Sequence, residues 1–379
     1  MARAQKVTDA DDVPEADRLE GFPHPREVMQ LVGHQAAEQA LGAALASGRL
    51  HHGWLLTGPD GIGKATLAYR FARAILHGEV ARSGSGSSLN VPADSTAAVQ
   101  IRALSHPGLL VIRRPWDPKN KRHIASIPVD EVRKLRGYLA HTAASEWRVV
   151  IVDSADELNV SAANAILKSL EEPPARTVFL LISSEPGRLL NTIRSRCRRL
   201  DLAALAPAEL EAAARAAFAA AGRDPPPDAE WSRLATLSGG SVRRLVGLYS
   251  AGGLDLDSAL DRLFAGLPGV DQPAAHALAD KISPAAAEER FGLFFDLLLD
   301  RLARLVRARA LGPRGDGQVD PADTELAARL IAEGELATWA ALWETLTREK
   351  AETLALNLDR KALILDTLSR LEAVARRRP

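Results

Sequence analysis

The sequence holds a single cysteine, Cys197, among 379 residues. One thiol excludes a disulfide framework and a cysteine-rich zinc site, and it favours a reducing compartment. An excess of charge of one sign is also lacking, because 48 basic residues balance 48 acidic residues. A chain without net positive charge is a poor candidate for a protein that reads DNA sequence on its own.

Long hydrophobic runs are absent as well. The longest leucine-rich stretch, residues 291–305, is interrupted by Asp296, Asp300 and Arg301, which excludes a membrane-spanning helix. The first twenty residues are polar and charged, and they contain no apolar segment of the kind found in a secretory signal. We therefore expect a cytoplasmic protein with no membrane partner.

The length predicts two or three domains. Short apolar runs alternate with helical patterns as far as residue 202, and the predicted strands are 54–56, 109–112, 149–152 and 178–182. This alternation favours a doubly wound α/β domain with a parallel sheet. After residue 202 the pattern is helical, and it predicts a helix over 207–220, two short helices within 231–250 and a loop over 311–321. We predict a flexible tail over 1–22, an α/β base domain over 23–202, a small helical domain over 203–268 and an all-helical domain over 274–379.

Two segments of the predicted base domain have the composition of loops. Residues 81–98 are rich in serine, glycine and alanine, which predicts a surface excursion. Residues 113–123 contain Asp-Pro-Lys-Asn, which predicts a hairpin, and their basic side chains surround Trp116. Contact with a DNA backbone is one interpretation of this hairpin, but a solvated turn is the favoured one.

The predicted strand at 54–56 leads into the segment TGPDGIGKAT, which has the spacing of a P-loop. Glycines let the backbone N–H groups point into one concavity, and the lysine of such a loop reaches the outer phosphates of a nucleotide. The candidate nucleotide-binding residues are Gly58, Gly61, Gly63, Lys64, Ala65 and Thr66. The alternative is a glycine-rich turn between a strand and a helix.

The position after the lysine argues against a working site. A P-loop that binds a magnesium–nucleotide complex has serine or threonine there, because the hydroxyl coordinates the ion. This sequence has Ala65 instead. Thr66 follows, but it lies about 100° further round the helix and cannot take over that role.

A second motif, the apolar run Val-Val-Ile-Val followed by Asp153, has the pattern of a Walker B strand. In ATP hydrolases of the AAA+ type the next residue is a glutamate that polarises the attacking water. Here the next residue is Ser154, and a serine hydroxyl is not a base at neutral pH. Two catalytic groups are missing, which predicts a degenerate nucleotide site without ATP hydrolysis. The simpler interpretation of Asp153 is a helix N-cap.

Residues 188–200 contain a cluster of arginines, namely Arg194, Arg196, Arg198 and Arg199. The default role of such residues is ordinary surface charge. However, a guanidinium is permanently charged and fork-shaped, and an arginine from a neighbouring subunit can stabilise charge in phosphoryl transfer. A chain with an inactive site of its own could therefore use such an arginine on a neighbour's site.

Five segments, taken in order, resemble the delta-prime family of bacterial DNA polymerase III clamp-loader subunits, which are AAA+ proteins. These segments are GPDGIGKAT, VVIVDSADELN, AANAILKSLEEPP, PGRLLNTIRSRC and LNLDRKALILDTLSRL. The resemblance extends from about residue 32 to the C-terminus. It implies a P-loop AAA+ base domain, followed by a small helical lid and a helical collar that holds a ring together.

The resemblance implies a hetero-pentamer with delta and gamma/tau subunits, which loads the sliding clamp onto primed DNA. It implies a largely non-hydrolysing stator whose motif Ser195-Arg196-Cys197 supplies Arg196 as a trans arginine finger. Arg243 is either a sensor-2 arginine or a solvated arginine of the lid. No metal and no obligatory cofactor are expected, although the retained Lys64 leaves weak binding of ATP or ADP open.

The sequence departs from the family at one point. Relatives often carry a four-cysteine zinc module between the P-loop and the Walker B strand, and a chain whose one cysteine is Cys197 cannot hold zinc there. Residues 81–98 stand in its place. Two alternatives remain: a catalytically active clamp-loader ATPase, and a small-molecule P-loop kinase, which the helical C-terminal third disfavours.

Overall fold

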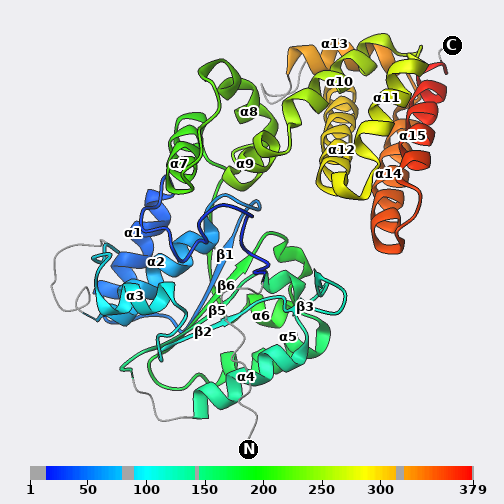
Figure 1. The fold of residues 1–379 in the computed structure, drawn as a ribbon. Coiled ribbons are helices and arrows are strands. Elements are labelled where there is room, and N and C mark those ends of the chain that lie inside the picture. Colours follow the sequence, from blue (N-terminus) through cyan, green and yellow to red (C-terminus); the bar gives the residue numbers. More distant parts are fainter. Residues whose placement is uncertain (1–13, 79–88, 141–144, 313–319, 378–379) are drawn as a thin grey trace, which may run out of the picture. The chain divides into compact units, whose positions relative to one another are not determined.

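The computed structural model describes residues 14–78, 89–140, 145–312 and 320–377 (Figure 1). The chain divides into two compact units, and the division falls between Leu245 and Val246. The first unit is α/β and the second is all-helical. Among the described residues, no helix has both the length and the apolar character needed to cross a membrane. The domain boundaries expected from the sequence stay predictions.

A five-stranded parallel sheet forms the centre of the first unit. Its strands are β1 (Gly53–Thr57), β2 (Leu109–Ile112), β5 (Arg148–Val152), β6 (Thr177–Ser183) and β7 (Arg198–Asp201). Their order is β2-β5-β6-β1-β7, and every pairing is parallel. The four strands predicted from apolar runs are confirmed. The fifth, β7, was not predicted, because an edge strand rich in arginine has no apolar run.

Helices cover both faces of this sheet (Figure 1). One face carries α1 (Gln35–Ala46), α2 (Lys64–His77) and α3 (Thr96–Arg102). The other face carries α4 (Val129–Ala140), α5 (Val160–Glu171) and α6 (Asn191–Arg194). Successive residues of a strand face opposite sides, so Trp54 and Leu56 belong to the first core and Leu55 to the second. The predicted doubly wound α/β fold with a P-loop is confirmed.

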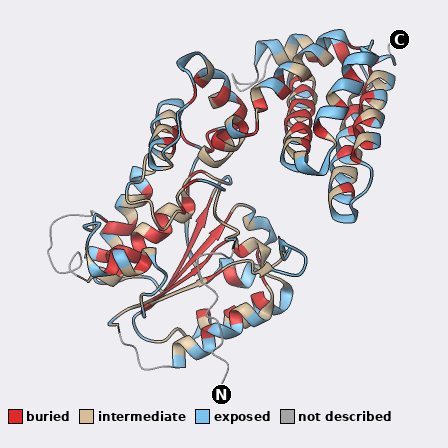
Figure 2. Ribbon diagram, viewed as in Figure 1, coloured by how far each residue is buried: buried red, intermediate tan, exposed pale blue. Residues whose placement is uncertain are grey.

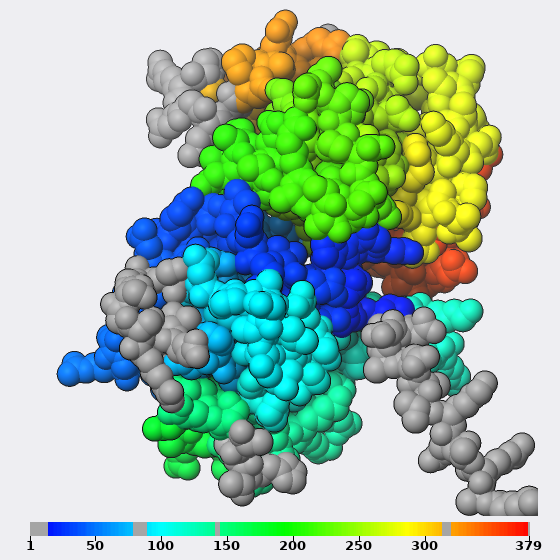
Figure 3. All heavy atoms as spheres, turned by 60° about the vertical axis from the view of Figure 1, so that its left-hand side comes forward, coloured from blue at the N-terminus to red at the C-terminus, as the bar shows by residue number. Residues whose placement is uncertain are grey.

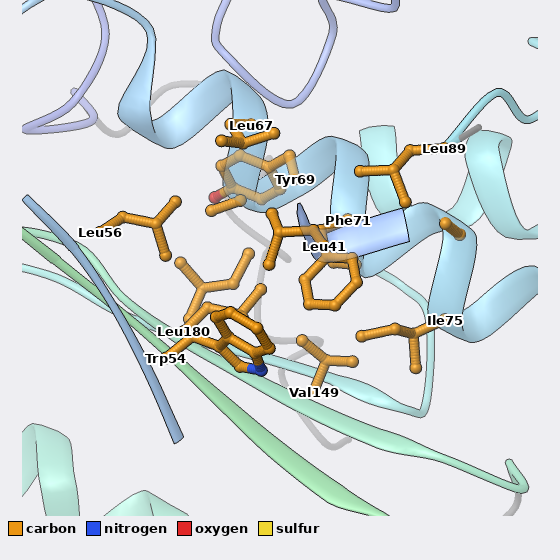
Figure 4. Packing of buried hydrophobic residues seen from close by; sticks show 14 of the residues in the cluster. Leu41, Trp54, Leu56, Leu67, Tyr69, Phe71, Ile75, Leu89, Val149 and Leu180 are labelled. Atoms are coloured by element: carbon orange, nitrogen blue, oxygen red, sulfur yellow. The ribbon is translucent and has the colours of Figure 1, made fainter. Parts of the chain in front are cut away.

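The three central strands β5, β6 and β1 are buried almost without interruption, as expected for a parallel sheet covered on both faces (Figure 2). Trp54 is the largest side chain of the first core, and its indole meets the ring of Phe71 edge to face at 6.2 Å (Figure 4). The indole N–H donates to the carbonyl of His51 at 3.0 Å. The sheet is therefore anchored on the helix that follows the P-loop, because Phe71 belongs to α2.

The predicted hairpin is present. β3 (Trp116–Asp117) pairs antiparallel with β4 (Arg122–His123). The carboxylate of Asp117 accepts hydrogen bonds from the amides of Lys119 at 2.9 Å and Asn120 at 3.2 Å, which closes the turn. The ring of Trp116 packs against that of His123 at 5.0 Å.

The surface excursion predicted over 81–98 is only partly within the described residues. Residues 79–88 lie outside them. Leu89 is buried in the first core, and α3 begins at Thr96. The end of this segment is therefore part of the folded α/β unit and not a surface excursion. The helix α3 was not predicted, because its apolar periodicity covers barely two turns.

The helices predicted after residue 202 have the expected bounds. They are α7 (Pro207–Ala220), α8 (Trp231–Ser238) and α9 (Val242–Ser250). Gly239 ends α8 in a left-handed conformation, which favours glycine. Short 3-10 helices lie at Ala155–Glu157 (η2), Pro186–Arg188 (η3), Asp228–Glu230 (η4) and Ala285–Ala287 (η5).

The second unit is a helical bundle. Its helices are α10 (Gly253–Gly266), α11 (Gln272–Ile282), α12 (Glu288–Leu311), α13 (Pro321–Leu330), α14 (Leu336–Leu356) and α15 (Arg360–Ala375). The long helix α12 contacts α10, α11, α13 and α14. Its buried Arg301 pairs with Asp257 at 3.2 Å and Asp261 at 2.5 Å on α10. The loop predicted over 311–321 falls largely on residues 313–319, which lie outside the described residues.

We expect Phe71→Ala to lower the free energy of unfolding of the first unit by about 3–5 kcal/mol, because the fully buried ring leaves a cavity. The control is Val160→Ala, since Val160 is 71% exposed and its loss should cost less than about 0.5 kcal/mol. Chemical denaturation followed by circular dichroism measures both. Equal midpoints for the two variants would contradict the packing.

Candidate functional site

The carboxyl ends of three strands meet at one edge of the sheet. Thr57 at the end of β1 pairs with Ser183 at the end of β6, and Val152 at the end of β5 pairs with Leu181. The residues that follow these strands are the P-loop, Ser184 and Asp153. The register of the sheet therefore brings the predicted nucleotide-binding residues together.

The P-loop has the backbone geometry that its glycines predict. Gly58, Gly61 and Gly63 have φ values of 142°, 72° and 109°, which other residues adopt only with strain. A Cβ atom on Gly58 would lie 2.2 Å from the carbonyl oxygen of Leu202. Gly63 is the N-cap of α2, so the helix begins at Lys64 as a P-loop helix does.

The ammonium group of Lys64 is satisfied by its own surroundings. It donates hydrogen bonds to the carbonyl oxygens of Gly58 at 2.8 Å and Pro59, and to the hydroxyl of Ser184 at 2.9 Å. Burial lowers the pKa of Lys64, although the charges of nearby aspartates oppose this. An ammonium has three N–H donors, so all three are engaged.

The two positions after the lysine offer no ligand for magnesium. Ala65 has no oxygen in its side chain, and its methyl group packs against the first core. Thr66 lies one residue further along α2. No cluster of three or more His, Cys, Asp or Glu side chains able to hold a metal occurs within the described part of the chain.

Asp153 follows directly after β5 and is buried, with 8% of its surface exposed. The N-cap of the following 3-10 helix η2 is Ser154, not Asp153, so the N-cap interpretation of Asp153 does not match the structure. The carboxylates next in sequence are engaged elsewhere. Asp156 accepts a hydrogen bond from the amide of Ser184 at 3.2 Å, and Glu157 pairs with Arg114 at 2.8 Å.

A residue from the predicted flexible tail lies against Asp153. The carboxyl group of Asp17 hydrogen-bonds with that of Asp153. Burial, together with the charge of Asp17, raises the pKa of Asp153 to about 8. Burial also favours the neutral form of Asp17, but the contact with His24 and the charge of Arg113 outweigh it and lower the pKa of Asp17.

Arg243 lies at the P-loop. Its backbone amide donates to the carbonyl of Gly61 at 3.3 Å, and a Cβ atom on Gly61 would lie 2.4 Å from the Cβ of Arg243. Its guanidinium donates to the carbonyl of Asp17 at 3.1 Å. This position agrees better with the sensor-2 interpretation than with a solvated arginine, but the guanidinium already has a protein partner.

These contacts do not fit a magnesium–nucleotide complex. The lysine donates to its own loop, the position that should supply a hydroxyl is an alanine, and the Walker B carboxyl group has a raised pKa and contacts Asp17. Each group would have to exchange a protein partner before it could meet a phosphate or a metal.

Arg196 lies in the turn between α6 and β7. Ser195 ends α6 and donates its hydroxyl to the carbonyl of Thr192 at 3.2 Å. The guanidinium of Arg196 donates to the same carbonyl at 2.9 Å and pairs with Glu171 at the end of α5 at 2.7 Å. Its side chain is 34% exposed, so it is not buried within its own fold.

The register of β7 separates Arg196 from its own nucleotide site. Arg198 pairs with Trp54 at the start of β1, and Asp201 pairs with Thr57 at its end. Arg196 therefore lies two residues before the paired strands begin, whereas the P-loop follows where they end. The four paired residues span about 13 Å, and Arg196 lies further back in the turn, which is beyond the reach of an arginine side chain.

The other arginines of the cluster have local partners. Arg194 donates to the side chain of Asn191, Arg199 pairs with Asp201 at 2.6 Å, and the Arg198 guanidinium lies 5.1 Å from the centre of the Trp54 ring. All three are exposed.

Sequence reasoning missed Asp17 and His24 and assigned Arg113 to the hairpin alone. Nothing in the composition of residues 14–24 marks them as buried, because they include several charged residues and no periodic apolar pattern. A pairing of acidic residues in this segment with Arg113 is visible only in three dimensions.

Part of the first unit is similar to known proteins. Residues 33–206 match a family described as DNA polymerase III, delta subunit. A Pseudomonas aeruginosa protein named DNA polymerase III subunit delta' is 41% identical over 162 residues, which are 42% of this chain and 46% of that protein. A Mycobacterium bovis DNA polymerase III subunit gamma/tau is 30% identical over 197 residues, which are 50% of this chain and 30% of that one.

The chain thus spans less than half the length of these curated relatives. Among solved structures, a Thermotoga maritima DNA polymerase III gamma subunit-related protein is 18% identical, with a TM-score of 0.41, over 90% of this chain and 100% of that one. A likeness this loose carries no argument about function. The relatives include both delta' and gamma/tau subunits, so the site residues must distinguish between these two kinds of subunit.

The thiol of Cys197, beside Arg196, should react slowly. Burial raises the pKa of Cys197 from an ordinary 9.0 to about 11. We therefore expect iodoacetamide to alkylate it roughly a hundredfold more slowly at pH 8 than an unburied thiol, with the rate rising about tenfold per pH unit up to its pKa. Intact-mass spectrometry measures the rate, and the same chain in denaturant is the control. Equal rates in both states would contradict this burial.

Proposed function

We propose that this chain is the delta-prime subunit of a clamp loader, on the basis that residues 33–206 match the DNA polymerase III delta-subunit family. In this proposal it is a largely non-hydrolysing stator in DNA replication. It helps to load the sliding clamp onto primed DNA, and Arg196 is its arginine finger for a neighbouring ATPase subunit. The names of its relatives, delta' and gamma/tau subunits, support a place in such a complex.

One observation carries this proposal: Arg196 lies at the opposite edge of the sheet from its own P-loop. An arginine there cannot serve its own site, but it is exposed enough to reach another subunit. Glu171 holds the guanidinium in the isolated chain, and a neighbour's γ-phosphate would replace that carboxylate as the anionic partner. Ser195 ends α6 and so fixes the turn that carries Arg196.

The partners follow from the same proposal. Gamma/tau and delta subunits would complete a hetero-pentamer, and the clamp and primed DNA would be contacted through that complex. The helical second unit is the proposed collar, because a bundle remote from the catalytic motifs in sequence is suited to assembly. No cofactor is required for the role of Arg196, and any binding of ATP or ADP by this chain would be weak.

Arg196→Ala in the reconstituted complex should reduce hydrolysis at the neighbouring site by about 10³-fold or more, because the developing charge on the phosphates loses its cation. Total ATPase activity, measured with clamp and DNA, should fall by that site's share. The matched control is Arg199→Ala, three residues along and 60% exposed, which should leave turnover unchanged. Gel filtration must show intact complexes, and unchanged turnover with Arg196→Ala would refute the role.

The alternative is an active ATPase subunit, which the match to gamma/tau subunits favours. Ala65 and Ser154 argue against it, because each stands at a position where an active subunit has a catalytic group. We expect the isolated chain and its Lys64→Ala variant to show the same background release of phosphate from ATP, with and without magnesium. A magnesium-dependent rate that disappears in Lys64→Ala would instead support the active subunit.

A further inference from the structure

One residue of the N-terminal segment, which we define as residues 14–28, contacts two groups that a nucleotide would need. The carboxyl group of Asp17 bonds with that of Asp153, the candidate metal ligand. Its backbone carbonyl accepts a hydrogen bond from Arg243, the candidate sensor-2 arginine, at 3.1 Å. Asp17 therefore contacts both Asp153, which would approach a metal, and Arg243, which would approach the outer phosphates.

Asp17 is fixed from behind by a cation and a histidine. Arg113 places one nitrogen 3.0 Å from Asp17 and another 2.6 Å from Glu15. Nε2 of His24 lies 2.6 Å from the Asp17 carboxylate. Nδ1 of His24 accepts from the amide of Arg26 at 3.0 Å, so we assign the proton to Nε2, which then donates toward Asp17. The side chains of Asp17 and His24 are 6% and 0% exposed, so this arrangement is part of the protein interior.

The rest of the segment is attached to the elements around the nucleotide site. Arg73 of α2 is buried, and it donates to the carbonyls of Arg26 at 2.9 Å and Val28 at 2.7 Å. Phe22 packs edge to face against Phe218 of α7 at 5.4 Å. In Figure 3 the first described residues, in dark blue, lie between the cyan and green parts of the first unit. The segment thus joins the P-loop helix to α7 and, through Asp17, to α9.

Binding of a nucleotide would conflict with Asp17 in either position. If Asp17 stays, Asp153 and Arg243 keep their protein partner and cannot turn to a metal or a phosphate. If it leaves, Arg113 loses one of its two carboxylate partners, and the buried Asp153 loses its hydrogen bond. Both costs are independent of the missing hydroxyl at Ala65.

We propose that the N-terminal segment is a built-in occupant of the nucleotide site, in which Asp17 holds Asp153 and Arg243 together and keeps ATP out. The inference concerns the chain's own site and holds whether or not Arg196 acts on a neighbour. It adds a steric barrier to the two missing catalytic groups. The site is then closed to the nucleotide itself and not merely unable to hydrolyse it.

The test compares ATP binding by full-length chains. Asp17→Ala should bind ATP about tenfold or more tightly than the wild-type chain, measured by isothermal titration calorimetry with and without magnesium. Arg113 keeps its contact with Glu15 in this variant, so the fold should persist. The matched control is Glu20→Ala, because Glu20 is an exposed acid of the same segment, and its ATP binding should equal that of the wild type.

A second variant and a second measurement complete the test. Asp17→Asn keeps the size of the side chain, so it should still fill the site and bind ATP no more tightly than the wild type. Hydrogen exchange at the amides of Asp153 and Ser154 should become faster in Asp17→Ala, because Asp153 loses its side-chain contact with the segment. The proposal is overturned if Asp17→Ala binds ATP no more tightly than the wild type, or if Asp17→Asn gains as much affinity as Asp17→Ala. Such a failure would leave the ATPase test of Arg196 untouched.

Discussion

The parallel register of β1 with its two neighbours is the constraint on which the rest of the first unit depends. Pairing with β6 places the P-loop beside Ser184 and close to Asp153, at the carboxyl edge of the sheet. Pairing with β7 places Arg196 at the amino edge. One set of backbone hydrogen bonds thus fixes a nucleotide-type site and a remote arginine on the same rigid body. A slip of one residue would exchange the two cores, because Trp54 and Leu55 face opposite sides.

The nucleotide-type site is held in a closed arrangement by contacts within the chain. The ammonium group of Lys64 is hydrogen-bonded to a carbonyl and a hydroxyl group of the protein, and the carboxyl group of Asp153 contacts a second carboxyl group. Such contacts let the loop and its helix serve as structural parts. Leu67 and Phe71 of α2 then stabilise the core of the sheet, and this task needs the fold of a P-loop but not its chemistry.

Much of the fold could be predicted from the sequence, because apolar strands and helix periodicity are local signals. The strand that leads into the P-loop and the helix Pro207–Ala220 were predicted on that basis. β7 could not be, since its charged residues face solvent at the edge of the sheet. The contact of Asp17 with Asp153 could not be predicted either, because it joins residues far apart in sequence, and a short acidic stretch gives no sign of burial. Arg196 was found through a motif, and its distance from the P-loop only through the register.

β7 has a further consequence for assembly. An edge strand leaves one row of backbone N–H and C=O groups open to pairing with a foreign strand, and exposed charged side chains oppose such pairing. Here Arg198 and Arg199 stand on that edge. A neighbouring subunit would therefore approach this flank through side chains and not by extending the sheet. If the proposed neighbour binds at this flank, the backbone pairing inside each subunit stays intact.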